Sequence, residues 1–381
     1  MPIAKRRILF LITTADWGGA QHFILLAAKE AKKRGYEIRL AAGETGELEA
    51  RCREAGLNFR RLKTVKRSIS PFADLAALYE IRLLIRDFKP DVVHLNSSKM
   101  SVVGSMAAQL EKVPLTIYRI GGWAFLEKLG WLKRLIYLKS EQWSASKKDI
   151  IVTVHPADEA LAKKLHITPR QKIVTIPNGI DLISFDVAAL SKSAARQALG
   201  LDENKIVIGT TANFYPAKNL PWYLQSLSPL LQANANLENV IIGDGPERAR
   251  IVDVIKQFGL EKSVRLIGRR DNAGALLKAF DIFCLPSSKE GMPWALLEAM
   301  AAGLPCIATD VGACRWMLEP NAGLIIPPNN AGALLESLKV LIANPEERLR
   351  LGQAARLAIQ TRFRLEDTIN KTFELFEKNN Q

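Results

Sequence analysis

Short apolar runs alternate with longer amphipathic stretches along this chain of 381 residues. In the first half, such runs predict buried strands at 6–12, 36–42, 91–96, 115–120 and 149–155. The stretch between the first two runs has one apolar face, formed by Phe23, Leu26, Ala27 and Ala31, and predicts a helix. Strands that alternate with helices are typical of a parallel α/β sheet.

The same alternation starts again after residue 200, with strands predicted at 205–212, 239–245, 264–269, 281–286 and 304–312. A chain of this length can form two domains. We therefore expect two doubly wound parallel sheets, joined near 186–202. The first domain is expected over 1–186 and the second over 187–360.

The stretch 287–312 carries the strongest candidate chemistry. Glu290 and Glu298 lie eight positions apart, with a Gly-Met-Pro turn and a predicted helix start between them. Pro293 suits the first helical turn, because its missing N–H would have no partner there. The free N–H groups of a helix start favour anions. Carboxylates on both sides of an anion site suit a sugar nucleotide, whereas the alternative is an exposed helix face beside a loop charge.

Five motifs follow one another in a recognisable order: WGGAQHFILLAAKEAKKRG at 17–35, IVTIPNGID at 173–181, GTTANFYPAKN at 209–219, VIIGDGPE at 240–247 and FDIFCLPSSKEGMP at 280–293. Through them, over nearly its whole length, the chain resembles the retaining GT-B-fold enzymes of glycosyltransferase family 4 (glycosyl transferases group 1). The resemblance implies two Rossmann-like domains facing a cleft that holds the active site. It also implies a final helix, 361–377, that packs back on the first domain.

The resemblance assigns roles to individual residues. It implies that Glu298 binds the ribose, that Glu290 binds the donor sugar, and that Lys218 neutralises the diphosphate. It also places the Gly18–Gly19 loop over the donor phosphates and the acceptor. The catalytic residues are then Glu290, Lys218 and Gly19, and the substrate-binding residues are Gly18, Arg119, Asn213, Arg270, Gly291, Met292, Pro293, Leu297 and Glu298.

Three positions depart from the family pattern. Asn213 stands where an arginine is usual, and Arg269 or Arg270 is the nearest candidate to replace its charge. Arg119 begins an Arg-Ile-Gly-Gly run where many relatives have His-Gly. Arg315 lies near a position that is often a glutamate. These departures leave the identity of donor and acceptor open.

The sequence offers no pattern for a bound metal ion. Its four histidines and four cysteines show no ligand spacing, and no Asp-x-Asp occurs. The resemblance implies metal-independent, retaining transfer without a cofactor, in which the leaving diphosphate deprotonates the acceptor hydroxyl. We expect a UDP- or GDP-linked donor and a lipid-linked or lipopolysaccharide-type glycan acceptor. A sugar-nucleotide epimerase of the same architecture is the alternative.

The net charge of +14 is concentrated in one half of the chain. Residues 1–190 hold 31 Lys and Arg against 19 Asp and Glu, and residues 191–381 hold 22 against 20. The densest basic stretch, 51–67, predicts docking on an anionic membrane surface, with a solvated basic surface as the alternative. A nucleic-acid-binding protein is a weaker alternative, because no such motif occurs.

The apolar stretch near the N-terminus is short and leads into a Gly-Gly loop, so we interpret it as a first strand and not as a signal peptide. Isolated cysteines agree with a reducing compartment. We therefore expect a cytoplasmic enzyme, peripheral at the inner face of the membrane. The Trp-containing stretch 120–143 could lie on a membrane, but we favour a helix with a core-facing side.

Overall fold

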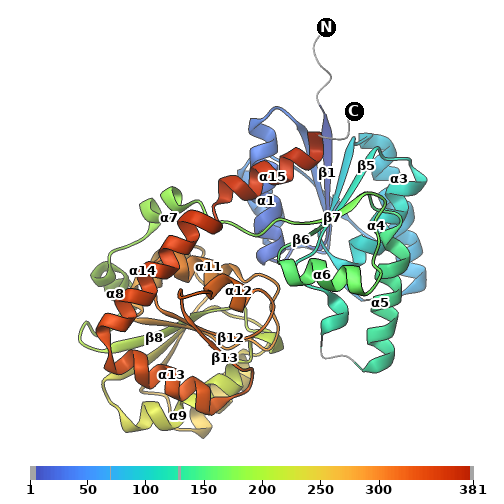
Figure 1. Cartoon of the computed structure of the whole chain (residues 1–381). Coiled ribbons are helices and arrows are strands. Elements are labelled where there is room, and N and C mark those ends of the chain that lie inside the picture. Colours follow the sequence, from blue (N-terminus) through green and yellow to red (C-terminus); the bar gives the residue numbers. More distant parts are fainter. Residues whose placement is uncertain (1–5, 69, 128–129, 378–381) are drawn as a thin grey trace. The chain divides into compact units, whose positions relative to one another are not determined.

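The computed structural model describes residues 6–68, 70–127 and 130–377. The chain forms two compact units (Figure 1). The first unit ends at Pro177 and resumes at Thr368, and the second runs from Asn178 to Asp367. The chain therefore passes from one unit to the other twice.

The first unit is built on seven parallel strands in the order β3-β2-β1-β4-β5-β6-β7. The strands are β1 (Arg7–Thr14), β2 (Glu37–Gly43), β3 (Asn58–Leu62), β4 (Val92–Leu95), β5 (Leu115–Arg119), β6 (Ile150–Thr153) and β7 (Lys172–Thr175). The helices are α1 (Gly19–Lys33), α2 (Glu47–Glu54), α3 (Pro71–Phe88), α4 (Ser98–Leu110), η1 (Ala124–Leu126), α5 (Trp131–Ala145) and α6 (Pro156–Lys164). Every residue of β4 and β5 is buried, as expected for central strands of a parallel sheet.

The last helix, α15 (Leu365–Glu377), supplies aromatic packing to the first unit. Phe373 lies 5.6 Å from the Tyr36 ring, and Phe376 lies 6.0 Å from the His94 ring, measured between ring centroids. Both phenylalanines are buried. The residues after Thr368 are thus part of the core of a unit formed mainly by the start of the chain.

The second unit contains six parallel strands in the order β10-β9-β8-β11-β12-β13. They are β8 (Ile206–Thr211), β9 (Leu237–Ile242), β10 (Val264–Gly268), β11 (Ile282–Leu285), β12 (Cys306–Thr309) and β13 (Leu324–Ile326). The helices are α7 (Leu182–Ala188), α8 (Lys192–Leu199), η2 (Pro216–Lys218), α9 (Leu220–Ala233), α10 (Arg248–Gln257), η3 (Ala273–Ala279), α11 (Trp294–Ala301), α12 (Cys314–Leu318), α13 (Ala331–Ala343) and α14 (Pro345–Arg362). Two doubly wound Rossmann-like sheets were predicted, and this fold class is confirmed.

The strand order of each sheet reverses at one point. In the first unit this switch lies between β1 and β4, and in the second between β8 and β11. Ligands of open α/β sheets bind beyond the carboxyl ends of the strands at such a switch. The loops that follow β8 and β11 contain Lys218 and Glu290, so the fold of the second unit positions the candidate site.

Gly209 in β8 allows close packing beneath this site. A β-carbon at this position would lie 2.1 Å from the Phe280 ring, which is buried. We expect Gly209→Ala to destabilise the protein by about 2 kcal/mol or more, because the ring must move within a packed core. The control is Gly332→Ala in α13, where the nearest atom would be 3.5 Å away and alanine favours the helix. Urea unfolding of both variants is the measurement, and equal stabilities would contradict the prediction.

Candidate functional site

The loops after β8 and β11 are bonded to each other. The Ser288 amide donates to the Ala217 carbonyl oxygen at 2.8 Å, and the Asn219 side-chain amide donates to the Pro286 carbonyl oxygen at 3.4 Å. Asn219 adopts a left-handed conformation, with φ of 57°, where η2 ends and α9 begins. These contacts fix the loop that carries Lys218 against the loop that carries Glu290.

Lys218 and Glu290 form an ion pair at the carboxyl edge of the sheet. The distance from Lys218 Nζ to Glu290 Oε1 is 2.6 Å, and the Ser287 hydroxyl donates to the same oxygen at 2.6 Å. The side chain of Glu290 is 9% exposed and that of Lys218 is 22% exposed. A carboxylate this deeply buried requires such charge-assisted partners. The pair therefore has fixed geometry and compensated charge.

Gly312 shapes the loop around Glu290. Its φ is +53°, and a β-carbon there would lie 2.4 Å from the Glu290 carbonyl oxygen. The Ala313 amide donates to the Gly291 carbonyl oxygen at 2.7 Å. Only glycine combines this backbone conformation with this close approach. The turn after β12 thus supports the loop after β11.

Glu298 lies in the second turn of α11, next to a small residue. A β-carbon on Gly274 would be 3.9 Å from the Glu298 carboxyl carbon. Burial raises the pKa of Glu298 to about 7. Among the residues that the structure describes, none hydrogen-bonds to this carboxylate. A half-buried carboxylate with unused acceptor oxygens is suited to a ligand that donates hydrogen bonds, such as a vicinal diol.

Met292 and Leu297, which lie between the two carboxylates in sequence, are fixed by hydrogen bonds and by burial. Met292 is 5% exposed, its sulfur accepts a hydrogen bond from the Asn178 amide at 3.1 Å, and its carbonyl oxygen accepts one from the Asn178 side chain at 3.0 Å. Leu297 is fully buried. The side chains of Met292 and Leu297 therefore support the loop and helix, and any contact from Met292 or Gly291 to a ligand would come from the backbone.

Two details differ from the expectations. Pro293 precedes the helix as its N-cap, and Trp294 is the first helical residue, so the placement of Pro293 in the first turn was wrong by one position. Asn178 was noted only as part of a motif. Its double contact with Met292 identifies it as a positioning residue, and the Pro-Asn-Gly sequence around it was the available signal.

Asn213 lies in a loop held by the Gly-Asp-Gly turn after β9. A β-carbon on Gly243 would lie 1.8 Å from the Ala212 carbonyl oxygen, and the Phe214 amide donates to the Asp244 carbonyl oxygen at 2.8 Å. Arg270 is exposed and follows β10, two strands away from β8. The structure thus orders Asn213 beside the Lys218 loop, and it gives no direct contact that brings Arg270 to it.

The remaining predicted residues belong to the first unit. Gly18 is the N-cap of α1 and accepts a hydrogen bond from the His22 amide at 2.9 Å, while Gly19 is the exposed first residue of the helix. Both follow β1, at the switch point of this sheet.

Arg119 at the end of β5 is only 6% exposed. Its Nη1 donates to the Ile176 carbonyl oxygen at 3.1 Å, and its guanidinium carbon lies 3.9 Å from the centroid of Phe23. Burial lowers the pKa of Arg119 to about 9. Packing explains much of this environment, so a role for Arg119 in ligand binding stays a prediction.

The described part of the chain contains no group of three or more His, Cys, Asp or Glu side chains arranged to hold a metal ion. All four cysteines are free and buried.

Comparisons with known proteins agree with this geometry. The model for glycosyl transferases group 1 matches residues 191–358, and the model for the glycosyl transferase 4-like domain matches residues 18–179. The chain belongs to the group 1 glycosyltransferases. It is a nucleotide-sugar-dependent, retaining glycosyltransferase of a family that is typically metal-independent.

Two relatives of known function align with most of this chain. The UDP-Gal:alpha-D-GlcNAc-diphosphoundecaprenol alpha-1,3-galactosyltransferase of Escherichia coli is 28% identical over 98% of this chain and 96% of its own. The N,N'-diacetylbacillosaminyl-diphospho-undecaprenol alpha-1,3-N-acetylgalactosaminyltransferase of Campylobacter jejuni is 25% identical over 89% of this chain and 91% of its own.

Among solved structures, Anabaena HepE in complex with UDP and glucose superimposes with a TM-score of 0.84 at 19% identity, covering 97% of this chain and 99% of HepE. The lipopolysaccharide glycosyltransferase WaaG gives a TM-score of 0.78 at 17% identity, covering 97% of this chain and 100% of WaaG. These likenesses confirm the GT-B fold of the transferase.

Replacing the two carboxylates should separate turnover from nucleotide binding. Glu290→Gln keeps the shape of the side chain but removes its charge, so we expect kcat to fall by about a hundredfold or more with the fold intact. Glu298→Ala should mainly weaken UDP binding. Steady-state kinetics and calorimetric titration with UDP are the measurements, with Glu336→Gln on the exposed face of α13 as control. Near-normal rates and affinities in both variants would show that the site is assigned wrongly.

The raised pKa of Glu298 predicts a pH dependence of UDP affinity. If the ionised carboxylate accepts the ribose hydroxyls, affinity should fall as the pH drops through about 7. Glu298→Gln should remove this dependence. Because burial raises the pKa of Glu298 from 4.5 to about 7, ionisation costs stability, which is lost as the pH rises from about 4.5 to about 7, so Glu298→Gln should also raise the apo melting temperature at pH 8. Titrations and melting curves between pH 6 and 8 test this, and an unchanged pH profile in the variant would contradict it.

Proposed function

We propose that this protein transfers a sugar from a UDP-linked donor to a hydroxyl of a lipid-linked or lipopolysaccharide-type acceptor, with retention of the anomeric configuration. Among these acceptors we favour a sugar already joined to a polyprenyl diphosphate. The two curated relatives described above are named for acceptors of this kind, and one of them for a UDP-linked donor. A GDP-linked donor has no comparable support.

The observation that carries the proposal is the buried Lys218–Glu290 pair beside the start of α11. With a donor bound, Lys218 Nζ can neutralise the diphosphate as its bond to the sugar breaks. Glu290 then orients the sugar hydroxyls, and Glu298 accepts the hydroxyls of the ribose. The amides of Gly291 and Met292, close to the start of α11, supply further donors.

The chemical step needs no protein nucleophile in this scheme. The bond between the anomeric carbon and the diphosphate oxygen breaks, and the acceptor oxygen attacks from the same face. The departing diphosphate takes the acceptor proton, so UDP and the new glycoside are the products. The protein contributes positioning and stabilisation of the negative charge on the leaving group.

The division of labour between the units is also part of the proposal. The second unit, expected over 187–360, binds the donor. The first, expected over 1–186 with the helix at 361–377, provides Gly18 and Gly19 and receives the acceptor. We propose a cytoplasmic location at the inner face of a membrane, since acceptors of this kind are anchored in lipid. None of the described helices is long and apolar enough to cross a bilayer.

Product analysis distinguishes the proposed transfer from the epimerase alternative. Incubation with a panel of UDP-sugars and a short-chain polyprenyl-diphosphate-linked sugar should release UDP only when the acceptor is present, and the new linkage should have the anomeric configuration of the donor. Release should persist in excess EDTA, because Lys218 supplies the positive charge at the diphosphate. An altered nucleotide sugar formed without acceptor would support the epimerase. Loss of activity in EDTA, restored by manganese, would contradict the metal-independent scheme.

A further inference from the structure

The outward faces of α3 and α5 are apolar. More than half of the large apolar side chains that are exposed in the described residues lie on α3, α4 and α5. On α3 they are Phe72, Leu75, Tyr79 and Leu83, and on α5 they are Trp131, Leu132, Leu135, Ile136 and Trp143. Phe72 is 89% exposed and Trp131 is 78% exposed. Helices on the surface of a soluble domain normally turn such residues inward, and a large exposed apolar patch marks an interaction site.

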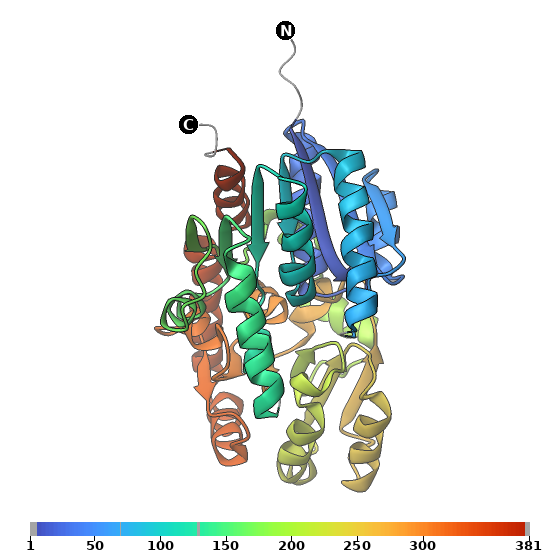
Figure 2. The same cartoon turned by 90° about the vertical axis from the view of Figure 1, so that its right-hand side faces the viewer.

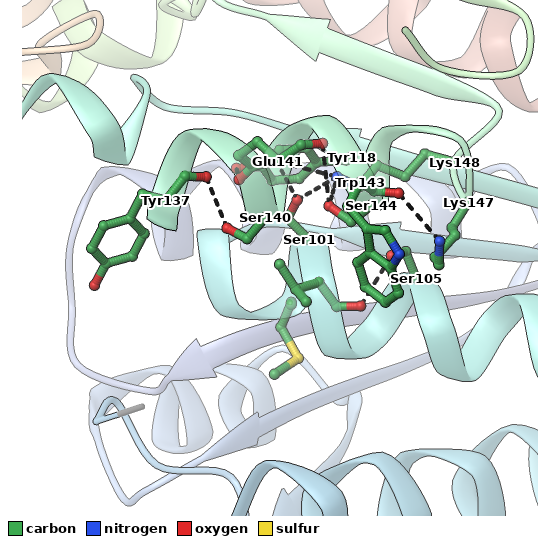
Figure 3. A network of polar contacts seen from close by, with 12 residues as sticks. Ser101, Ser105, Tyr118, Tyr137, Ser140, Glu141, Trp143, Ser144, Lys147 and Lys148 are labelled. Carbon is green, nitrogen blue, oxygen red and sulfur yellow. Dashed lines mark hydrogen bonds and ion pairs between the residues drawn. The ribbon is translucent and has the colours of Figure 1, made fainter. Parts of the chain in front are cut away.

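Polar side chains are buried at the C-terminal end of α5 and just after it. Glu141 and Lys148 are 2% and 0% exposed, and the distance from Lys148 Nζ to Glu141 Oε2 is 3.2 Å. The Ser101 hydroxyl, from α4, donates to the same carboxylate at 2.7 Å, and Lys148 also donates to Ser144 Oγ at 2.9 Å. Figure 3 shows these side chains pointing toward one another. This network anchors the C-terminal half of α5 to α4.

Helix α5 thus exposes large apolar side chains in its first turns and buries polar ones in its last turns. All six residues from Trp131 to Ile136 are exposed, whereas Glu141 and Ser144 are buried. For the stretch 120–143, a helix with a core-facing side was favoured over one that lies on a membrane. The structure packs Tyr137 and Leu138 against the core, which is the expected core-facing side, and exposes Trp131 and Trp143.

The first turns of α3 and α5 lie at one edge of the first unit. Helix α3 follows β3 and α5 follows β5, so both begin on the side where the parallel strands end. Helix α4 packs against both, and Figure 2 looks onto this layer of three helices. The Gly18–Gly19 loop follows β1 and opens at the same edge. The part of the surface formed by the first turns of α3 and α5, with Phe72, Leu75 and residues 131–136, is therefore on the side of the unit that carries its candidate ligand loop.

Basic residues accompany the apolar ones. Lys133, Arg134 and Lys139 on α5 are exposed, and none of them forms an ion pair with any residue described. The edge strand β3 and the loop after it add further exposed cations, namely Arg60, Arg61, Lys63, Lys66 and Arg67. Apolar and Trp side chains flanked by Lys and Arg match the boundary between lipid headgroups and acyl chains.

We propose that the surface of α3 and α5 docks on an anionic phospholipid bilayer, with the first turns of α5 inserted at headgroup level. The biological role of this docking rests on the proposed function, because a lipid-linked acceptor lies in a membrane. The exposed apolar and basic residues that support the docking do not depend on that proposal. A second copy of the chain fits this surface less well. A second copy would present the same exposed cations, Lys133 and Arg134, to a symmetric contact, whereas an anionic bilayer presents charges of the opposite sign.

Flotation with vesicles tests the proposal with matched variants. Leu132→Gln together with Ile136→Gln changes two residues that are 55% and 53% exposed and one helical turn apart. The control changes Leu349 and Leu357 on α14, which are 63% and 57% exposed, to Gln. With phosphatidylglycerol vesicles, we expect the α5 variant to lose at least tenfold in partition coefficient and the α14 control to stay within twofold of the natural protein.

A charge variant separates attraction from insertion. Lys133→Gln with Arg134→Gln should weaken binding to phosphatidylglycerol vesicles several-fold, and high salt should mimic this change by screening. Changing Arg60, Arg61, Lys63 and Arg67 together to Ser tests the basic stretch alone. If that variant abolished flotation while the α5 variant floated normally, insertion of α5 would be refuted. Equal loss in the α14 control would refute it as well.

Light scattering and transfer assays distinguish membrane docking from dimerisation and from the proposed transfer reaction. Light scattering that shows a dimer for the natural protein and a monomer for the α5 variant, without lipid, would replace the bilayer by a second copy. The α5 variant should keep its melting temperature, its shift with UDP and its transfer to a short-chain acceptor. Failure of transfer in the natural protein would refute the proposed function, whereas normal flotation of the α5 variant would refute only the docking surface.

Discussion

The ion pair between Lys218 and Glu290 is the constraint on which the donor side of this enzyme depends. Two loops from neighbouring strands must bring opposite charges within 2.6 Å in a largely buried place, and neither charge could remain there alone. The supporting contacts follow from this requirement. The Ser287 hydroxyl donates a second hydrogen bond to the Glu290 carboxylate, and Gly312 lets the loop after β12 approach the Glu290 backbone closely. Asn178 binds the carbonyl oxygen of Met292, two residues further along the same loop. Much of the local sequence is therefore explained by the need to fix one charged pair.

Most of the fold follows from periodicity, because buried parallel strands appear as short apolar runs between helices. The missed strands are the ones for which this signal is weak. They are β3, β7 and β13, and each lies at an edge of its sheet. In β3 three of five residues are exposed, in β7 no residue is fully buried, and β13 has only three residues. Their pairing depends on the neighbouring strand, which a local pattern does not contain.

The charged residues of the candidate site were predictable from the sequence, but most of the contacts that hold them in place were not. Glu290, Glu298 and Lys218 were recognisable because their motifs are distinctive. The contact between Asn178 and Met292 joins residues 114 positions apart, and no local rule predicts such a pair. For α5 the sequence left two possibilities open, since an apolar stripe indicates a covered side without saying whether protein or another apolar phase covers it.

Because the chain passes into the second unit and then returns to the first, the order of synthesis affects when each unit can complete its core. The first unit contains Phe373 and Phe376, which a ribosome adds only after all six strands of the second unit. A nascent chain can therefore complete the second sheet while the earlier one still lacks part of its core around Tyr36 and His94. The unit whose synthesis begins first therefore completes its core last. A chain that stopped before α15 would lack core packing in the first unit, around Tyr36 and His94, although the missing helix follows the second unit in the sequence.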